Sequence, residues 1–348
     1  MLCKAPWNHI QVNSQGTVNP CCMFSPTMYK QEYNSLQEAF DGPENQELRK
    51  RMLAGEKISG CHKCDLYDDL GMHSYRKHFD KYDIENPKIR ELEYSIDNTC
   101  NFKCVTCNSR FSHLWYEDDL ELQRMGIPRQ NTYAMRQKKK VQKTGADWRN
   151  LDLSELSYLK IIGGEPFTNQ KYLEFLQNID LSDVTIMIAT NNSVFPKKWI
   201  DTLLTAKEVR LRISLDGVGD VGEFVRYGLD MEKFDKNFEE WKKLPINISF
   251  NYVYHILNCL NLEKTREYIG DYKLIIDYLS DPEYLDVKYA PDELKNQMPY
   301  EVWEYANRGQ FNQPRMKYFI EYCNWLERRS MMPAECEYIY EQILSSSF

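Results

Sequence analysis

The sequence predicts an α/β fold: a partial (β/α)6 barrel that follows a small cysteine-rich module and precedes a helical tail. From about residue 90, six apolar runs end in polar or glycine-rich turns, at 91–96, 159–162, 184–189, 209–215, 246–253 and 285–289. Helical stretches alternate with these runs, at 169–179, 196–205 and 231–243. Strand and helix repeated in this way predict a parallel sheet whose functional residues lie at the carboxyl ends of the strands.

Composition limits the classes of function. The 348 residues are 42% hydrophobic, which is enough for a large core, and a net charge of -8 does not favour a surface that attracts nucleic acid throughout. The amino-terminal segment MLCKAPWNHI lacks the pattern of a secretory signal, and no stretch approaches the roughly 20 apolar residues of a membrane span. We therefore expect a cytoplasmic protein without a membrane partner.

Three domains are expected. The module at 1–75 begins with a hairpin around the turn at 13–16 and contains a helix at 44–54 that leads to Cys61 and Cys64. The barrel covers 88–290.

A helical extension covers 291–348. In it, Tyr318, Tyr322 and Trp325 have i, i+4, i+7 spacing, which predicts a packing stripe. The long connection at 111–150 is expected to contain a helix at 112–125 and an irregular insertion.

The cysteines are the most informative residues. Eleven cysteines without an export signal favour metal ligands or free thiols over disulfides. Directly after the first predicted strand, Cys100, Cys104 and Cys107 have C-x3-C-x2-C spacing. Three thiolates leave one iron of a four-iron cubane with an open coordination position. A zinc site and incidental core cysteines are the alternatives, although zinc normally takes four ligands in paired C-x2-C units.

The motif resembles the signature of the radical S-adenosylmethionine (SAM) superfamily, and further matches follow in the family's order. The second run continues into Gly163, Gly164, Glu165 and Pro166, which resemble the family's GGEP element. The resemblance implies that this element binds the amino group of the methionine part of SAM. Glycines let the backbone approach a ligand closely, and Glu165 can accept a charge-assisted hydrogen bond.

Other residues are placed near SAM by the same resemblance. Asn191 and Ser214 end the third and fourth runs, and Arg226 is implied to hold the SAM carboxylate as a bidentate donor. Local turn capping is the alternative for Asn191 and Ser214, and a surface position is the alternative for Arg226. The family usually has an aromatic residue before the third cysteine, where Thr106 stands; Phe102 is expected to compensate by shielding the adenine.

The implied chemistry is reductive cleavage of SAM. The reduced [4Fe-4S] cluster on Cys100, Cys104 and Cys107 would transfer an electron into SAM bound at the open iron, releasing methionine and a 5′-deoxyadenosyl radical. That radical would abstract hydrogen from an unactivated carbon, while the protein orients SAM and excludes water. The implied electron donor is a protein such as flavodoxin or ferredoxin.

The amino-terminal cysteines form a second set of four ligands, Cys3, Cys21, Cys61 and Cys64. The G-x4-C element from Gly16 to Cys21 resembles the SPASM and twitch modules, which carry auxiliary [4Fe-4S] clusters in many radical SAM enzymes. Here the module precedes the barrel, as in a subgroup with an amino-terminal twitch. Zinc is the alternative metal, and Cys22 is an alternative to Cys21.

Several other residues receive ordinary interpretations. A buried structural thiol is favoured over a hydrogen donor for Cys259. Cys323 and Cys336 are expected to be inert and His62 exposed. A solvated face is favoured for the basic cluster Arg136, Lys138, Lys139, Lys140 and Lys143.

Three hypotheses for function follow. The first is an enzyme that modifies a peptide or protein side chain, because twitch and SPASM modules are associated with such substrates. The second is radical modification of a nucleotide, sugar or nucleic acid, which the basic segment at 136–143 would serve. The third is a non-enzymatic iron–sulfur electron carrier or a zinc-dependent adaptor.

Overall fold

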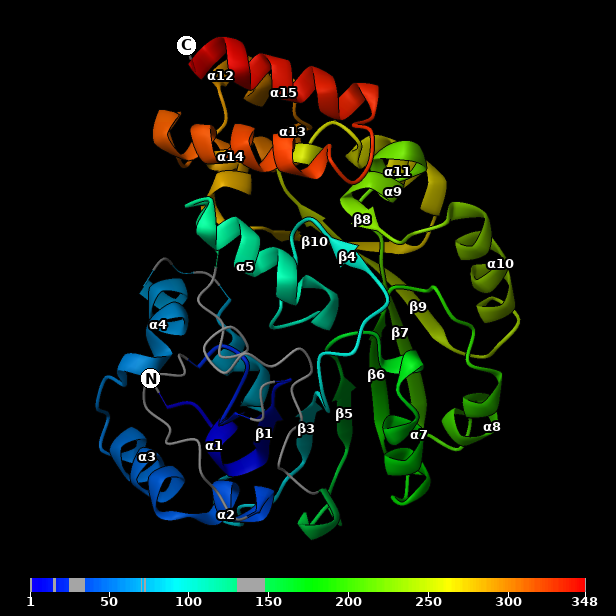
Figure 1. Ribbon diagram of the computed structural model, residues 1–348. Coiled ribbons are helices and arrows are strands. Elements are labelled where there is room, and N and C mark those ends of the chain that lie inside the picture. The colour runs from blue at the N-terminus through cyan, green and yellow to red at the C-terminus, as the bar shows by residue number, and fades with distance from the viewer. Residues whose placement is uncertain are drawn as a thin grey trace. The chain divides into compact units, whose positions relative to one another are not determined.

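The computed structural model describes residues 2–14, 17–24, 35–69, 71, 73–129 and 148–347 (Figure 1). Contacts divide the chain into two compact parts. The first part comprises residues 1–98, 141–188 and 196–210, and the second comprises residues 99–140, 189–195 and 211–348.

The first part contains an amino-terminal hairpin, parallel strands and short helices. Its strands are β1 (His9–Val12), β2 (Val18–Asn19), β3 (Glu91–Tyr94), β5 (Tyr158–Ile161) and most of β6 (Thr185–Thr190). Its α-helices are α1 (Ala5–Asn8), α2 (Leu36–Asp41), α3 (Pro43–Leu53), α4 (His62–Asp69), α7 (Gln170–Gln177) and α8 (Ile200–Leu203). Short 3-10 helices are η2 (Ser59–Cys61), η3 (Tyr75–Phe79), η5 (Trp148–Asn150), η6 (Pro166–Thr168) and η7 (Lys197–Trp199).

These strands lie in the order β6-β5-β3-β1-β2. β1 pairs antiparallel with β2 and parallel with β3, and the pairs β3–β5 and β5–β6 are also parallel. The registers place four apolar side chains in one row, each at most 2% exposed: Ile10, Leu92, Leu159 and Ile186. Because alternate strand residues face the same side, this row forms one buried apolar face of the sheet.

The next row in the same register is polar. Gln11 and Lys160 flank Glu93 on neighbouring strands and donate to its carboxylate at 2.5 Å and 2.7 Å. Glu93 is 1% exposed, and a carboxylate buried to that extent needs such donors. This network joins the amino-terminal hairpin to β3 and β5. The expected domain boundary near residue 75 stays a prediction.

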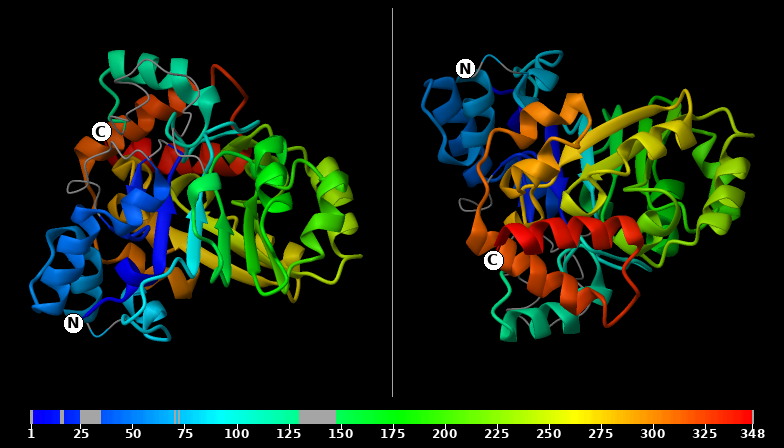
Figure 2. Two further views of the ribbon diagram at one scale, coloured as in Figure 1. Left: turned by 90° about the horizontal axis from the view of Figure 1, so that it is seen from below. Right: turned by 90° about the horizontal axis from the view of Figure 1, so that it is seen from above.

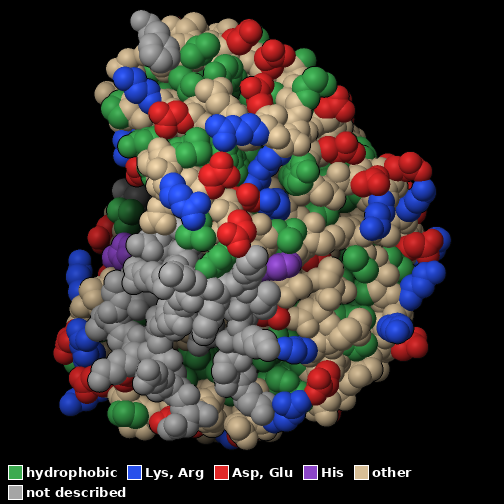
Figure 3. Space-filling model, viewed as in Figure 1, with side chains coloured by type: hydrophobic (Ala, Val, Ile, Leu, Met, Phe, Trp, Pro, Cys, Tyr) green, Lys and Arg blue, Asp and Glu red, His purple; other side chains and the backbone are tan. Residues whose placement is uncertain are grey.

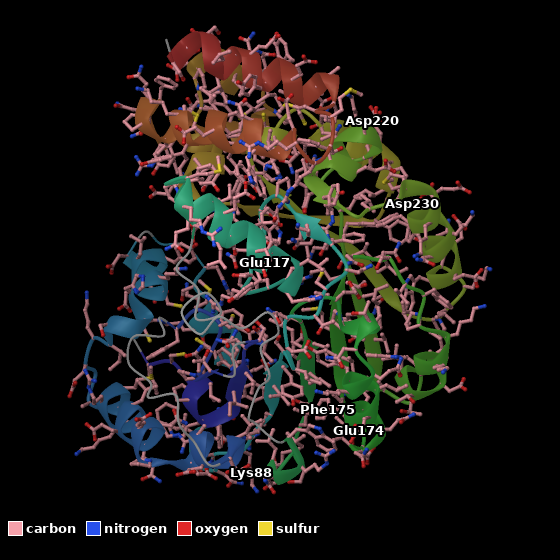
Figure 4. The ribbon with its side chains drawn as sticks, in the orientation of Figure 1. Lys88, Glu117, Glu174, Phe175, Asp220 and Asp230 are labelled. Carbon is pink, nitrogen blue, oxygen red and sulfur yellow. The ribbon has the colours of Figure 1, made fainter. Side chains whose placement is uncertain are left out.

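Helix α7 packs on the apolar face of β3. The Phe175 ring lies 5.1 Å from that of Tyr94 and 5.2 Å from that of Trp148, measured between centroids. Its neighbour Glu174 is exposed and pairs with Arg149 at 2.5 Å (Figure 4). The helix therefore has the apolar and polar faces that the predicted stretch at 169–179 requires.

The second part contains the remaining elements. Its strands are β4 (Lys103–Cys104), most of β7 (Glu208–Ser214), β8 (Arg226–Tyr227), β9 (Asn247–Tyr254) and β10 (Lys273–Tyr278). Its α-helices are α5 (Tyr116–Arg124), α9 (Gly219–Val225), α10 (Met231–Trp241), α11 (Leu262–Ile269), α12 (Asp292–Lys295), α13 (Tyr300–Ala306), α14 (Gln313–Leu326) and α15 (Ala334–Ser347). Its 3-10 helices are η4 (His113–Trp115), η8 (Ile256–Asn258), η9 (Glu283–Leu285) and η10 (Val287–Tyr289).

Strands β10, β9 and β7 are neighbours in that order, with β9 and β10 parallel, while β4 and β8 form a separate antiparallel pair. The carboxy-terminal helices α14 and α15 run side by side (Figure 2). Acidic, basic and hydrophobic side chains are mixed on the surface in this region (Figure 3), although α15 itself contains no Lys or Arg. None of the helices among the described residues is long and apolar enough to cross a bilayer.

The aromatic stripe of the tail is confirmed for two of its three residues. Tyr322 and Trp325 are at most 2% exposed, and the Trp325 ring stacks on that of Trp115 with 5.8 Å between centroids. Tyr318 is 36% exposed and lies at the surface. The stripe therefore packs against the segment that follows the cysteine loop.

Five of the six predicted strands are confirmed, as β3, β5, β6, β7 and β9. The prediction of a strand at 285–289 is wrong, because this segment forms η9 and η10 and the sixth strand is β10. Leu285, Val287 and Tyr289 alternate as in a strand, but the Asp286 carboxylate accepts from the amide of Lys288 at 3.0 Å and caps a turn.

Tyr172 is expected to stabilise the strand ends of the first part. Its hydroxyl accepts from the amide of Ile96 at 2.8 Å and donates to the carbonyl of Ile162 at 2.9 Å. Tyr172→Phe leaves both buried groups without this partner and should lower the free energy of unfolding by about 2 kcal/mol. Denaturant titration measures this loss. The exposed Tyr67→Phe serves as control, and an equal effect of both substitutions would refute the interpretation.

Candidate active site

The three cysteines of the C-x3-C-x2-C motif lie in one loop of the second part. Cys104 belongs to β4, which pairs with β8 so that Cys104 lies opposite Arg226. The amide of Cys107 donates to the carbonyl of Cys104 at 2.9 Å, so the chain turns tightly between the second and third thiols. All three cysteines are partly buried.

The ionisation of Cys107 depends on its burial and on the other two thiols of the motif. Burial raises the pKa of Cys107 well above its usual range, and Cys104 and Cys100 raise it further. Burial also raises the pKa of Cys104. Three neighbouring thiols are ionised together only where cations compensate their charge, as the irons of a cluster do. The donor set therefore fits an iron–sulfur cluster held by three cysteines.

Arg226 is a buried cation next to this loop. It is 7% exposed, donates from Nη1 to Asp216 Oδ2 at 2.6 Å, and has its guanidinium 5.9 Å from the centroid of the Phe102 ring. Burial lowers the pKa of Arg226, but Cys104 and Asp216 outweigh this effect and raise it. The surface alternative for Arg226 is therefore wrong. Its contact with the SAM carboxylate stays a prediction.

Asp216 was not singled out by the sequence reasoning. Its Oδ1 accepts from the amide of Val253 at 2.8 Å, and its main-chain carbonyl accepts from Asn258 Nδ2 at 2.8 Å. Asp216 thus joins the end of β7 to β9 and orients Arg226. The available signal was an acidic residue directly after an apolar run, next to Gly217.

Asn191 connects the end of β6 to the cysteine loop. Its Nδ2 donates to Asn101 Oδ1 at 2.9 Å, and its Oδ1 accepts from the amide of Ser193 at 2.9 Å. Asn101 in turn donates to Ser193 Oγ at 2.8 Å. Asn191 thus caps a local turn, and its contact with SAM stays a prediction. Ser214 ends β7 and is half-buried, and its role toward SAM also stays a prediction.

Phe102 is 2% exposed and packs against Gly228. A Cβ atom added at Gly228 would meet Phe102 Cδ1 at 2.8 Å, so only glycine lets the ring lie here. The main-chain carbonyl of Phe102 accepts from Ser112 Oγ at 2.8 Å. The ring is therefore fixed between Gly228 and Arg226, and its proposed shielding of the adenine stays a prediction.

The Gly-Gly-Glu-Pro element lies in the first part, directly after β5. Gly163 and Gly164 have φ angles of 90° and 52°, a conformation that favours glycine. A Cβ atom at Gly163 would lie 1.8 Å from Ser95 Oγ. Glu165 is 1% exposed and its carboxylate accepts from the amide of Phe167 at 3.2 Å. Pro166 then begins η6.

The four amino-terminal cysteines of the predicted second set line one pocket of the first part, together with Phe24, Gly60 and Phe79. Burial raises the pKa of Cys3 to about 11 and that of Cys61 to about 12. Four thiols that line one pocket are donors of the type that an iron–sulfur cluster takes. No three or more His, Cys, Asp or Glu side chains among the described residues are arranged to hold a single metal ion.

Cys22 is not among the residues that line this pocket. Burial raises the pKa of Cys22 to about 11, and Glu93 raises it while Lys160 lowers it. These partners belong to the polar row on β3 and β5, so the side chains of Cys21 and Cys22 have different surroundings.

Cys259, Cys323 and Cys336 are fully buried and His62 is exposed, as expected. Gly16 and the basic cluster at 136–143 lie outside the described residues.

Comparisons with known proteins place the chain in a family. The model of the radical SAM superfamily matches residues 94–269, and the model of the SPASM iron–sulfur cluster-binding domain matches residues 3–65. Among curated proteins, none is similar enough in sequence to count as a match.

Three similar solved structures have low identity to the chain. Hexahistidine-tagged anSMEcpe with bound AdoMet is 18% identical, with 68% of this chain and 64% of that chain covered and a TM-score of 0.43. Streptococcus suis SuiB bound to precursor peptide SuiA is 14% identical, with 86% and 60% covered and a TM-score of 0.38. TYW1 with a lysine–pyruvate adduct bound is 14% identical, with 82% and 88% covered and a TM-score of 0.35. The chain therefore spans less than two thirds of the length of the first two proteins.

Gly163→Ala should disturb the turn after β5 more than backbone strain alone would. Gly55 also has a positive φ, but nothing lies within 4 Å of an added Cβ atom there. We expect Gly55→Ala to cost about 1 kcal/mol and Gly163→Ala about 3 kcal/mol, because the latter adds the collision with Ser95. Denaturant titration gives both values. The double variant Ser95→Gly/Gly163→Ala should recover the difference, and a failure to recover it would contradict the steric explanation.

Proposed function

We propose that this chain, which belongs to the radical SAM superfamily, holds its SAM-binding cluster on Cys100, Cys104 and Cys107 and modifies a peptide or protein side chain. Family membership makes it an enzyme that binds a [4Fe-4S] cluster and cleaves SAM. The choice of ligands and the class of substrate are the new elements of the proposal.

The observation that carries the ligand assignment is the grouping of three thiols in one loop. All three lie within residues 100–107, and the tight turn between Cys104 and Cys107 keeps two of them on one short segment. Within the family match at 94–269 the other cysteine is Cys259, which is fully buried beyond β9. A cubane held by three thiols retains one open iron, where a chelating cofactor can bind.

Two residues of the second part, Arg226 and Phe102, support the orientation of SAM. When bound, the reduced cluster supplies one electron and SAM supplies the 5′-deoxyadenosyl group. Arg226 is held by Asp216 and offers the remaining donors of its guanidinium to a carboxylate. Phe102 offers an apolar ring that excludes water. Glu165 is assigned to the amino group of SAM on the resemblance of Gly163, Gly164, Glu165 and Pro166 to the family's GGEP element.

The proposed domains are an auxiliary module at 1–75, a barrel at 88–290 and a helical extension at 291–348. In the module, Cys3, Cys21, Cys61 and Cys64 are assigned to an auxiliary [4Fe-4S] cluster, and the pocket favours Cys21 over Cys22. Four thiolates from the protein complete the ligation of a cubane, so this cluster would relay electrons or support the fold and would not bind substrate.

The match to the SPASM domain supports the substrate class. Modules of this kind are associated with enzymes that act on peptides and proteins. A flavodoxin or ferredoxin is the proposed electron donor.

Iron content tests the ligand assignment. After anaerobic reconstitution, the parent should contain roughly eight irons per chain and the triple alanine variant at Cys100, Cys104 and Cys107 about four, from two clusters of four irons. Unchanged iron in the triple variant would contradict the assignment.

A matched control separates the two sites. The quadruple alanine variant at Cys3, Cys21, Cys61 and Cys64 should also contain about four irons. Of the two variants, only the quadruple variant should keep an electron paramagnetic resonance (EPR) signal that changes when SAM is added.

Binding measurements test the substrate class. We expect the reconstituted enzyme to retain members of a random peptide library and to show no salt-dependent binding of mixed-sequence oligonucleotides, because few phosphates would be neutralised. Fluorescence anisotropy at a series of salt concentrations measures the second property. Salt-dependent oligonucleotide binding without peptide retention would favour a nucleic-acid substrate instead.

A further inference from the structure

Backbone groups at the end of the cysteine loop are held by a buried ion pair. Arg129 donates from Nη2 to the carbonyl of Cys107 at 2.5 Å and from Nε to Asp119 Oδ1 at 2.8 Å. Asp119 Oδ2 accepts from the amide of Ser109 at 2.6 Å. The two charged side chains therefore contact backbone groups just after the third cysteine.

This pair is deeply buried. The side chains of Arg129 and Asp119 are 2% and 0% exposed. The guanidinium lies over the ring of Trp115, 4.6 Å from its centroid, and donates to the Tyr284 hydroxyl at 3.3 Å. Buried ion pairs contribute little net stability compared with apolar residues of the same size, so stability alone does not explain the pair.

The pair is also oriented. Its positive member contacts the carbonyl of the cysteine itself, whereas its negative member contacts an amide two residues farther along. A group bound at Cys107 would therefore experience the positive end of the pair. Nearby charge and hydrogen bonds set the reduction potential of an iron–sulfur cluster.

We propose that Arg129 and Asp119 are a positioning pair that fixes the third cysteine and raises the reduction potential of the cluster bound there. This proposal rests on the assignment of Cys100, Cys104 and Cys107 as ligands. Positive charge next to Cys107 favours the reduced, more negative state of the cluster, and Asp119 limits that effect by compensating the charge.

Redox titration of single variants tests the proposal. Arg129→Gln removes the positive end and should lower the midpoint potential, whereas Asp119→Asn leaves the guanidinium uncompensated and should raise it. We expect each to change the equilibrium constant for one-electron reduction about tenfold, which corresponds to about 59 mV. The midpoint potential of the double variant should return toward that of the parent protein. The signal is followed by EPR and identified by its response to added SAM.

A purely structural role predicts a different pattern. A structural role alone would shift the midpoint potentials of both single variants in the same direction, or would leave both unchanged. Either result would overturn the proposal. Arg266→Gln is the matched control, because Arg266 forms an ion pair with Glu301 at the surface of the same part and should not change the potential.

Arg129→Lys decides the case if the other variants do not fold. Lysine keeps the charge but lacks the fork that contacts Asp119 and Cys107 together, so the SAM-responsive signal should change its shape while the chain stays folded. An unchanged signal and potential would overturn the proposal, and so would failure of all three variants to fold. A parent without any SAM-responsive signal would overturn the ligand assignment itself.

Discussion

The backbone of the cysteine loop has to be paired although the chain turns tightly there, and the second part of the chain is organised around this constraint. A loop that turns tightly between ligands forms neither a helix nor a long strand, and β4 has only two residues. The remaining polar groups need side-chain partners, because each buried group left unpaired costs about 1–3 kcal/mol. Tyr322 donates to the carbonyl of Val105 at 2.8 Å, and Ser112 donates to that of Phe102.

The two sets of cysteines are placed by the chain in different ways. In the second part, all three cysteines lie within residues 100–107, and distant side chains only fix the loop. In the first part, the four thiols come from the chain start, the end of the hairpin, η2 and α4, so tertiary packing must assemble them. The polar row of Gln11, Glu93 and Lys160 supplies part of that packing, since it ties the hairpin to β3 and β5.

The limits of prediction follow from the same distinction. Apolar runs predicted five strands because the pattern of each strand lies within a few consecutive residues. The motif after the first strand predicted the three cysteine ligands from a short stretch of sequence in the same way. Strand β10 was missed because Lys273 and Asp277 bound a core of only three apolar residues, while 285–289 alternates like a strand. Arg129 and Asp119 carry no local signal, since only the folded chain brings them to the loop, and Asp216 carries only that of an acidic residue after an apolar run.

The carboxy-terminal helices also contribute residues that only the folded chain brings to the cysteine loop. The stripe on α14 predicted packing alone, and Tyr322 is indeed fully buried. Yet its hydroxyl holds Val105 between the second and third thiols, and the Arg129 guanidinium lies 5.7 Å from the centroid of its ring. One side chain thus serves the core, the loop and the buried cation together. Because hydrogen bonds and stacking that share atoms are coupled, the tail is part of the cysteine loop's support and not an independent cap.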